Sequence, residues 1–165
     1  MIFETKRLRI RKLVTSDLDL FHKMQSNINV MQFADGEVKN LEEHRKELNE
    51  LIKKYKQPNN VFWIYAVVRK MDNKFIGTLA LVKDNKDDEI GYRFLEEYWG
   101  NGYGLELCKA TINYCKNIGM KKIVAYVVDK NIASIKILEK LNFKVVDTFI
   151  SDDIELPETK YEIKL

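Results

Sequence analysis

The sequence is poor in the side chains that form cross-links and bind metals, with two cysteines and two histidines among 165 residues. Cys108 and Cys115 lie seven positions apart on the apolar side of one predicted helix, which separates them by about 10 Å, too far for a disulfide. With His22 and His44 as the only histidines, the chain has too few soft ligands for a metal cluster. We therefore expect reduced core thiols and no metal. The alternative is a nucleophilic Cys108, because it lies near a helix N-terminus.

Long apolar runs and a strong excess of charge of one sign are also missing. No apolar segment approaches the ~20 residues of a membrane-spanning helix, and the opening MIFETKRL lacks the basic and then apolar pattern of a signal peptide. The net charge is +3, and the basic residues near the start alternate with apolar ones, as on a solvated strand face. We therefore expect a cytoplasmic protein with neither a membrane nor a nucleic acid as its partner.

The apolar pattern predicts a single mixed α/β domain over residues 1–165. Consecutive β-rich segments with short turns predict an antiparallel meander. A strand, a helix and a strand then follow in the order that gives a parallel pair, and two last strands close the chain as an antiparallel pair. The predicted strands are 7–14, 61–69, 74–83, 89–95, 122–128, 143–150 and 159–165, and the helices begin near 16 and 40 and cover 103–118 and 132–141.

Local signals predict where helices begin and end. Thr15 or Ser16 is expected to cap the first helix, and Asn40 the second, with Glu43 completing a capping-box pair. The stretch between these helices is expected to be irregular. Asn142 ends the last helix, where a left-handed conformation is usual and asparagine is the best substitute for glycine.

Glycine recurs at three alternate positions after a predicted strand, in the stretch EIGYRFLEEYWGNGYG. Gly100, Gly102 and Gly104 allow close approach of the backbone and positive φ. A helix begins directly after them, and its first N–H groups lack intrahelical partners and carry the positive end of the helix dipole. The arrangement predicts a site for a phosphate or pyrophosphate.

Two known phosphate loops can be compared with this one. A P-loop ends in Gly-Lys-Ser/Thr, whereas Gly104 is followed by Leu105 and Glu106, so that design is excluded. A dinucleotide site has G-x-G-x-x-G and an acidic residue after the next strand. Asp129 does end the next apolar run, but the spacing here is G-x-G-x-G and the unit begins past the middle of the chain. The dinucleotide site stays as an alternative.

Two segments resemble the motifs of the GNAT acetyltransferase superfamily. The segment WGNGYG, Trp99 to Gly104, is similar to its loop Gln/Arg-x-x-Gly-x-Gly/Ala. Asn131 to Ser134, followed by LEKLNF, is similar to its Asn-x-x-Ser and Leu-x-Lys-Leu-Gly-Phe. The stretch GYRFLEEYWGNGYGLEL especially resembles the branch of ribosomal-protein N-terminal acetyltransferases and spermidine acetyltransferases. The opening TKRLRIRKL extends the resemblance to nearly the whole chain.

The resemblance implies a GNAT-like central sheet, in which an antiparallel meander is joined to a parallel strand pair that splays apart between flanking helices. It also implies acetyl-CoA as co-substrate, with its pyrophosphate on the glycine loop and its pantetheine in the splay. A backbone N–H near Phe94 or Leu95 would polarise the acetyl carbonyl. The implied cofactor-binding residues are Phe94, Leu95, Trp99, Gly100, Asn101, Gly102, Tyr103, Gly104 and Asn131.

The implied chemistry is direct attack of a neutral primary amine on the thioester. Glu89, at the head of the strand beside the splay, is the candidate base, directly or through water. A solvated surface carboxylate is the alternative. Much of the superfamily protonates the leaving thiolate with a tyrosine where this chain has Leu138. Ser134 is therefore the candidate for that role, and Tyr92 and Tyr126 are its alternatives.

The amine acceptor is left open, as a protein N-terminus, a polyamine or another small amine. A lysine-like amine is only about 0.1% neutral at pH 7.4, and an α-amine about a fifth neutral, so the first needs a stronger base. Asp35 and Glu37, between the first two helices, attract an amine or are merely solvated. A non-catalytic CoA- or nucleotide-binding module is the alternative to an acetyltransferase. The oligomeric state, a homodimer included, is also open.

Overall fold

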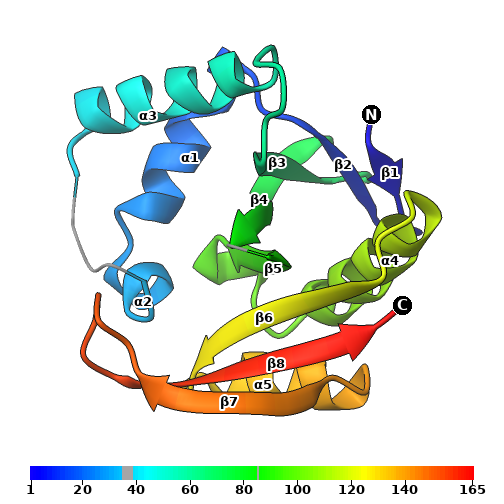
Figure 1. Cartoon of the computed structure of the whole chain (residues 1–165). Coiled ribbons are helices and arrows are strands. Elements are labelled where there is room, and N and C mark those ends of the chain that lie inside the picture. Colours follow the sequence, from blue (N-terminus) through cyan, green and yellow to red (C-terminus); the bar gives the residue numbers. More distant parts are fainter. Residues whose placement is uncertain (35–38, 85) are drawn as a thin grey trace.

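The computed structural model describes residues 1–34, 39–84 and 86–165. Within them, eight strands form one mixed sheet in the order β1-β2-β3-β4-β5-β6-β8-β7 (Figure 1). The strands are β1 (Phe3–Glu4), β2 (Leu8–Lys12), β3 (Phe62–Arg69), β4 (Lys74–Asp84), β5 (Asp87–Phe94), β6 (Lys122–Val128), β7 (Lys144–Ile150) and β8 (Pro157–Lys164). The helices are α1 (Leu18–Gln25), α2 (Ile28–Met31), α3 (Leu41–Lys54), α4 (Tyr103–Asn117) and α5 (Ile132–Lys140), with 3-10 turns η1 (Thr15–Asp17) and η2 (Glu96–Tyr98).

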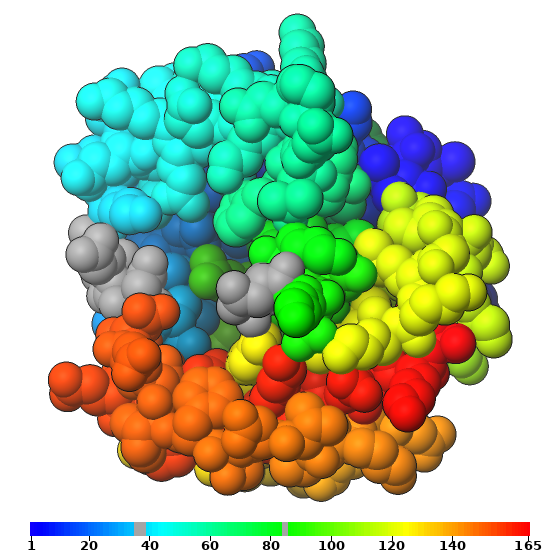
Figure 2. All heavy atoms as spheres, viewed as in Figure 1, coloured from blue at the N-terminus to red at the C-terminus, as the bar shows by residue number. Residues whose placement is uncertain are grey.

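Helices cover both faces of the sheet. Side chains alternate between the two faces of a strand, and on β3 this sends Ala66 and Val68 into a core with α1 and α3. Tyr65 and Val67 of the same strand pack with Leu107 of α4 in a second core. In Figure 2, α3 (cyan) lies at the upper edge of the molecule and β7 and β8 (orange to red) at the lower edge. The predicted mixed fold is confirmed.

The parallel pair β5–β6 is closed at one end and open at the other. Among the described residues, the recorded register between the two strands is a single position, Glu89 opposite Val124. Asp87, two residues before Glu89, forms ion pairs with Lys122 of β6 at 2.7 Å and with Lys160 of β8 at 2.6 Å. Hydrogen bonds from these lysines hold the pKa of Asp87 at about 2. Beyond Glu89 the strands diverge, as the resemblance implies. A doubly wound parallel sheet, which the dinucleotide alternative requires, is not what the described strands form.

Some helix signals are confirmed and others are wrong. Asn40 and Glu43 form the predicted reciprocal capping box of α3, and Asn142 has φ 64°. The first α-helix, however, does not begin at Thr15 or Ser16, because Thr15–Asp17 form a 3-10 turn. There the Asp17 carboxylate accepts the Val14 N–H at 3.0 Å. The stretch after α1 contains the short helix α2, and the strand β1 was not predicted.

Both cysteines lie reduced in the core, as predicted. Cys108 is 1% exposed and Cys115 is fully buried, and burial raises the pKa of each thiol to about 12. A thiol with such a pKa is a poor nucleophile at neutral pH. None of the helices in the described ranges is long and apolar enough to cross a membrane.

Candidate functional site

The glycine loop adopts the backbone that its composition predicts. Gly100 has φ 73° and Gly102, the N-cap of α4, has φ 76°, a region that side chains other than glycine rarely adopt. Gly104 lies inside the first turn, and a Cβ there would come within 2.9 Å of Ile137 Cδ1 and 3.5 Å of the Tyr92 ring. Glycine is therefore needed for conformation at two positions and for space at the third.

A cavity of about 840 Å³ lies against this loop, and we call it the loop cavity. Its lining includes all three loop glycines, Trp99 and Tyr103. The opposite wall runs along α5 and the residues before it, and it carries the basic residues Lys130, Lys136 and Lys140 and one acidic residue, Glu139. Free N–H groups at a helix start and three lysines across from them suit an anion. The loop cavity therefore has the donors that the phosphates of CoA require.

The predicted loop residues do not all face this cavity. Trp99 lines it, and its indole N–H donates to the Phe94 carbonyl at 3.0 Å. Asn101 does not appear among the described lining residues, because its amide nitrogen donates to the carbonyls of Tyr98 (3.1 Å) and Trp99 (2.9 Å). Asn101 thus stabilises the loop from its outer side. The sequence had predicted that Asn101 contacts the cofactor.

Leu95 does not fit its predicted role. The residue is 2% exposed and packs in the core with α1 and α3, and its N–H donates to the Ile76 carbonyl of β4 at 2.9 Å. Since successive N–H groups of a strand point to opposite edges, the N–H of Phe94 points to the other side, toward the opening between β5 and β6. Of the two candidates for polarising a carbonyl, Phe94 is the one that the geometry favours.

A second cavity, of about 770 Å³, lies on the other side of β5. Within the described chain, carboxylates outnumber lysine and arginine side chains in its lining by four to two, and we call it the acidic cavity. The carboxylates are Glu47, Glu89, Asp153 and Glu158, the two cationic side chains are Lys39 and Arg93, and His44 also lines it. Burial raises the pKa of Glu158. Asp35 and Glu37, which were predicted to attract an amine, lie outside the described residues.

The two cavities meet at a small set of shared side chains. The polar ones are Tyr92 and Arg93 of β5, Asn131 before α5 and Ser134 on α5, and the apolar ones are Val30 of α2 and Phe33. The side-chain oxygen Oδ1 of Asn131 accepts the Ser134 N–H at 3.2 Å, so Asn131 caps α5. The sheet is open at this point, so groups on its two faces come together here.

Tyr92 and Ser134 form a hydroxyl pair at this junction, with their oxygen atoms 3.2 Å apart. Burial raises the pKa of Tyr92, so the phenol stays protonated at neutral pH. A protonated phenol can donate to Ser134 Oγ, which leaves the serine proton free to point elsewhere. Leu138, the position of the usual tyrosine, is a buried core residue at 3% exposure.

Polar side chains also tie β5 to the helices that cover the acidic cavity. Arg93 donates to Gln25 of α1 at 2.9 Å, and Gln25 donates to Glu47 of α3 at 3.3 Å. Nearby, the Nδ1 atoms of His22 and His44 lie 2.7 Å apart. Desolvation lowers the pKa of His44, so this imidazole stays uncharged at neutral pH. The sequence did not predict that the two histidines meet.

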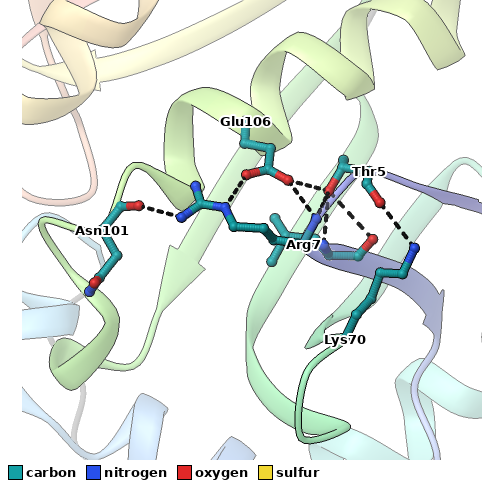
Figure 3. Close-up of polar contacts among 6 residues, drawn as sticks. Thr5, Arg7, Lys70, Asn101 and Glu106 are labelled. Carbon is teal, nitrogen blue, oxygen red and sulfur yellow. Dashed lines mark hydrogen bonds and ion pairs between the residues drawn. The ribbon is translucent and has the colours of Figure 1, made fainter.

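A further network, on the outer side of the glycine loop, was missed altogether (Figure 3). Arg7 donates through Nε to the Glu106 carboxylate at 2.6 Å and through Nη1 to the Asn101 carbonyl at 2.9 Å. Its guanidinium stacks over Tyr103, 4.4 Å from the ring centre. Arg7 was interpreted as part of a solvated strand face. The signal that could have found it was Glu106, an acidic residue in the first turn after the loop.

Comparison with known proteins gives the family. Residues 7–144 match the family model described as an acetyltransferase (GNAT) domain. The chain is 27% identical over 148 residues to YoaA, an uncharacterized N-acetyltransferase of Bacillus subtilis, and the match covers 87% of this chain and 82% of that protein.

Solved structures share the fold. A GNAT-family acetyltransferase from Bacillus anthracis has a TM-score of 0.85 at 24% identity, over 98% of this chain and 96% of that chain. The ribosomal L7/L12 α-N-protein acetyltransferase RimL, in complex with coenzyme A, has a TM-score of 0.84 at 19% identity, over 99% and 97%. The spermidine N-acetyltransferase of Vibrio cholerae, in complex with CoA and spermine, has a TM-score of 0.82 at 19% identity, over 97% and 96%.

Proposed function

The chain belongs to the GNAT acetyltransferase family, and we propose that it transfers the acetyl group of acetyl-CoA to a primary amine held in the acidic cavity. The observation that carries this proposal is the meeting of the two cavities at Tyr92, Arg93, Asn131 and Ser134. One cavity has the donors for phosphates and the other has an excess of carboxylates. A reaction between an anionic donor and a cationic acceptor requires such a junction.

The loop cavity would hold the co-substrate, which supplies an activated acetyl thioester when bound. The first N–H groups of α4 and the lysines of the α5 wall would bind its phosphates. The N–H of Phe94, directed toward the opening of the sheet, would donate to the acetyl oxygen as negative charge develops there. Trp99 would support this backbone through its bond to the Phe94 carbonyl.

Glu89 is the proposed base, and its position favours a relay through water. It lines the acidic cavity from β5, three residues before Tyr92. Three residues of a strand span about 10 Å, so the carboxylate lies near the cavity wall rather than at the junction itself. A water between Glu89 and the junction would pass the proton of the ammonium to the carboxylate.

Ser134 is the proposed donor to the leaving sulfur. The two hydroxyl oxygens lie 3.2 Å apart. With the Tyr92 phenol as the donor to Ser134 Oγ, the serine hydrogen would be free to point into the junction. Because burial keeps Tyr92 protonated, the phenol would orient the serine rather than give up its own proton. This pair of hydroxyls, one from β5 and one from α5, would take the role of the tyrosine that many family members have where this chain has Leu138.

The excess of carboxylates in the acidic cavity favours an acceptor with positive charge. The RimL structure is named for an acetyltransferase of a protein N-terminus, and the Vibrio cholerae structure for one of spermidine. Both classes of amine are therefore proposed for this chain, and the carboxylates favour the polyamine.

The test is a screen of amines for consumption of acetyl-CoA, with N-terminal peptides, polyamines and free amino acids as acceptors. We expect turnover with at least one cationic amine, and loss of that turnover in Glu89→Gln. Tight CoA binding without turnover on any amine would contradict the proposal and favour the non-catalytic module.

A further inference from the structure

The outer side of the glycine loop is held by the turn between β1 and β2 (Figure 3). Thr5 donates to Glu106 at 2.5 Å, and the Arg7 N–H donates to the same carboxylate oxygen at 2.9 Å. Lys70 donates to the Thr5 carbonyl at 3.2 Å and fixes the turn from the other side. A segment about a hundred residues away in sequence therefore holds the first turn of α4.

Arg7 acts on the loop through the peptide group between Asn101 and Gly102. A trans peptide is planar, so its C=O and N–H point in opposite directions. The Asn101 carbonyl is directed outward, because it accepts Nη1 of Arg7 at 2.9 Å. The N–H of Gly102 is consequently directed away from Arg7. Gly102 lines the loop cavity, and neither Arg7 nor Asn101 is among the described residues that do.

Glu106 would otherwise oppose an anion in the loop cavity, because it places a carboxylate in the first turn of α4. Burial disfavours its ionisation, but hydrogen bonds from Thr5 and Arg7 outweigh burial and hold its pKa below the ordinary value. The carboxylate is thus ionised and bound on the outer side. Arg7 offsets its charge at 2.6 Å, which leaves the helix start available to a phosphate.

We infer that Arg7 is a positioning residue for the phosphates of CoA, which it does not touch: it turns the Gly102 N–H into the loop cavity and neutralises Glu106 behind it. The inference rests on the proposed function, because it takes CoA as the occupant of the loop cavity. Arg7 is 42% exposed, and exposed ion pairs add little to stability. Its loss should therefore alter binding and leave the fold in place.

The test is Arg7→Met, with Arg9→Met as the matched control. Arg9 lies on the adjacent strand β2, and its guanidinium donates to Asn73, away from the loop. CoA affinity is measured by calorimetry, and folding is checked by thermal unfolding. The value of kcat/KM is measured with acetyl-CoA and with S-acetylpantetheine, a thioester that lacks the phosphates. We expect Arg7→Met to weaken CoA binding at least tenfold. The kcat/KM for S-acetylpantetheine should stay within twofold of the wild-type value. Arg9→Met should leave CoA affinity within twofold.

Unchanged CoA affinity in Arg7→Met overturns the inference, and so does an equal loss with both acetyl donors, since that marks a general structural role. Should Arg7→Met fail to fold, Arg7→Lys decides. Lysine keeps the charge but cannot bond the carboxylate and the carbonyl together in the geometry of a guanidinium. We expect Arg7→Lys to weaken CoA binding severalfold, and wild-type affinity in this variant would overturn the inference. A wild-type protein that does not bind CoA would instead contradict the proposed function.

Discussion

The two cavities meet at Tyr92 and Ser134 but are built in different ways. The loop cavity is made mainly by one continuous segment, the end of β5, the glycine loop and the start of α4, with α5 opposite and residues from 29–33, in α2 and the turn after it, completing the lining. Much of its chemistry comes from backbone N–H groups. The acidic cavity is assembled from side chains of many elements, among them α1, α3, β4, β5, β6, α5 and β8, and its chemistry comes from carboxylates.

This difference decides how each cavity responds to substitution. A site made of backbone is sensitive to conformation, so the residues that matter are glycines and the side chains that hold the loop. A site made of side chains is sensitive to the identity of each group, and it can change its acceptor without changing the fold. We therefore expect the loop cavity to set the co-substrate and the acidic cavity to set the amine.

The largest expected effect tests the acidic cavity. If Glu89 takes the proton of the ammonium, Glu89→Gln should lower kcat by about 10²-fold with little change in CoA affinity. The acidic limb of kcat/KM, where a protonated base is inactive, should also vanish from the pH profile. Asp88→Asn is the matched control, because Asp88 is the neighbouring carboxylate on the opposite face of β5 and pairs with Lys83.

Full activity of Glu89→Gln with an unaltered pH profile would contradict the role of Glu89. The amine would then arrive neutral or lose its proton to water. That result would favour an N-terminal α-amine over a polyamine, since the α-amine, with a pKa of about 8, has an appreciable neutral fraction unaided.

The next effect tests the loop cavity. In Gly102→Asp, a Cβ at position 102 would lie 3.5 Å from Arg7 Nη2, at a φ of 76° that disfavours aspartate. The carboxylate would compete with Glu106 for Arg7 and add negative charge beside the phosphates. CoA binding by calorimetry should weaken at least tenfold. Gly119→Asp has the same backbone strain, at φ 88° in open space, and it should keep wild-type affinity; an equal loss in both would contradict a specific site.

A smaller effect tests the junction between the cavities. Ser134→Ala and Tyr92→Phe should each lower kcat about two- to tenfold, the value of one hydrogen bond, and the double variant should lose little more. The decrease in kcat should disappear with an acetyl thioester of a more acidic thiol, because its thiolate is a good leaving group without a hydrogen bond from Ser134. An equal loss with both thioesters would show that the pair does not assist the leaving sulfur.

The smallest effect on activity is expected at the buried thiol. Cys108→Ala should keep turnover within a fewfold and lower stability by about 1 kcal/mol, because the smaller side chain leaves a gap in the core. Thermal unfolding and a steady-state assay measure the two. A folded variant without activity, or an acetylated Cys108 found by mass spectrometry, would contradict direct transfer to the amine.

The sequence by itself determined the glycine loop and the order of the longer helices and strands, but not β1 or α2. Gly100 and Gly102 take positive φ, and Asn40 caps α3 with Glu43, because each depends on neighbours within a few residues. The crossover of β5, α4 and β6 was likewise predictable, since apolar periodicity and chain order suffice to indicate it.

Only the tertiary structure decided which of these groups meet. Arg7 and Glu106 are 99 residues apart in sequence, and Tyr92 and Ser134 are 42 apart. The direction of the Leu95 N–H depended on the register of β4 against β5. Because this N–H donates to the Ile76 carbonyl, it is not available to polarise the acetyl carbonyl. A periodic pattern tells which face of an element is buried, but the partner across that face is set by how the sheet opens and where the helices pack.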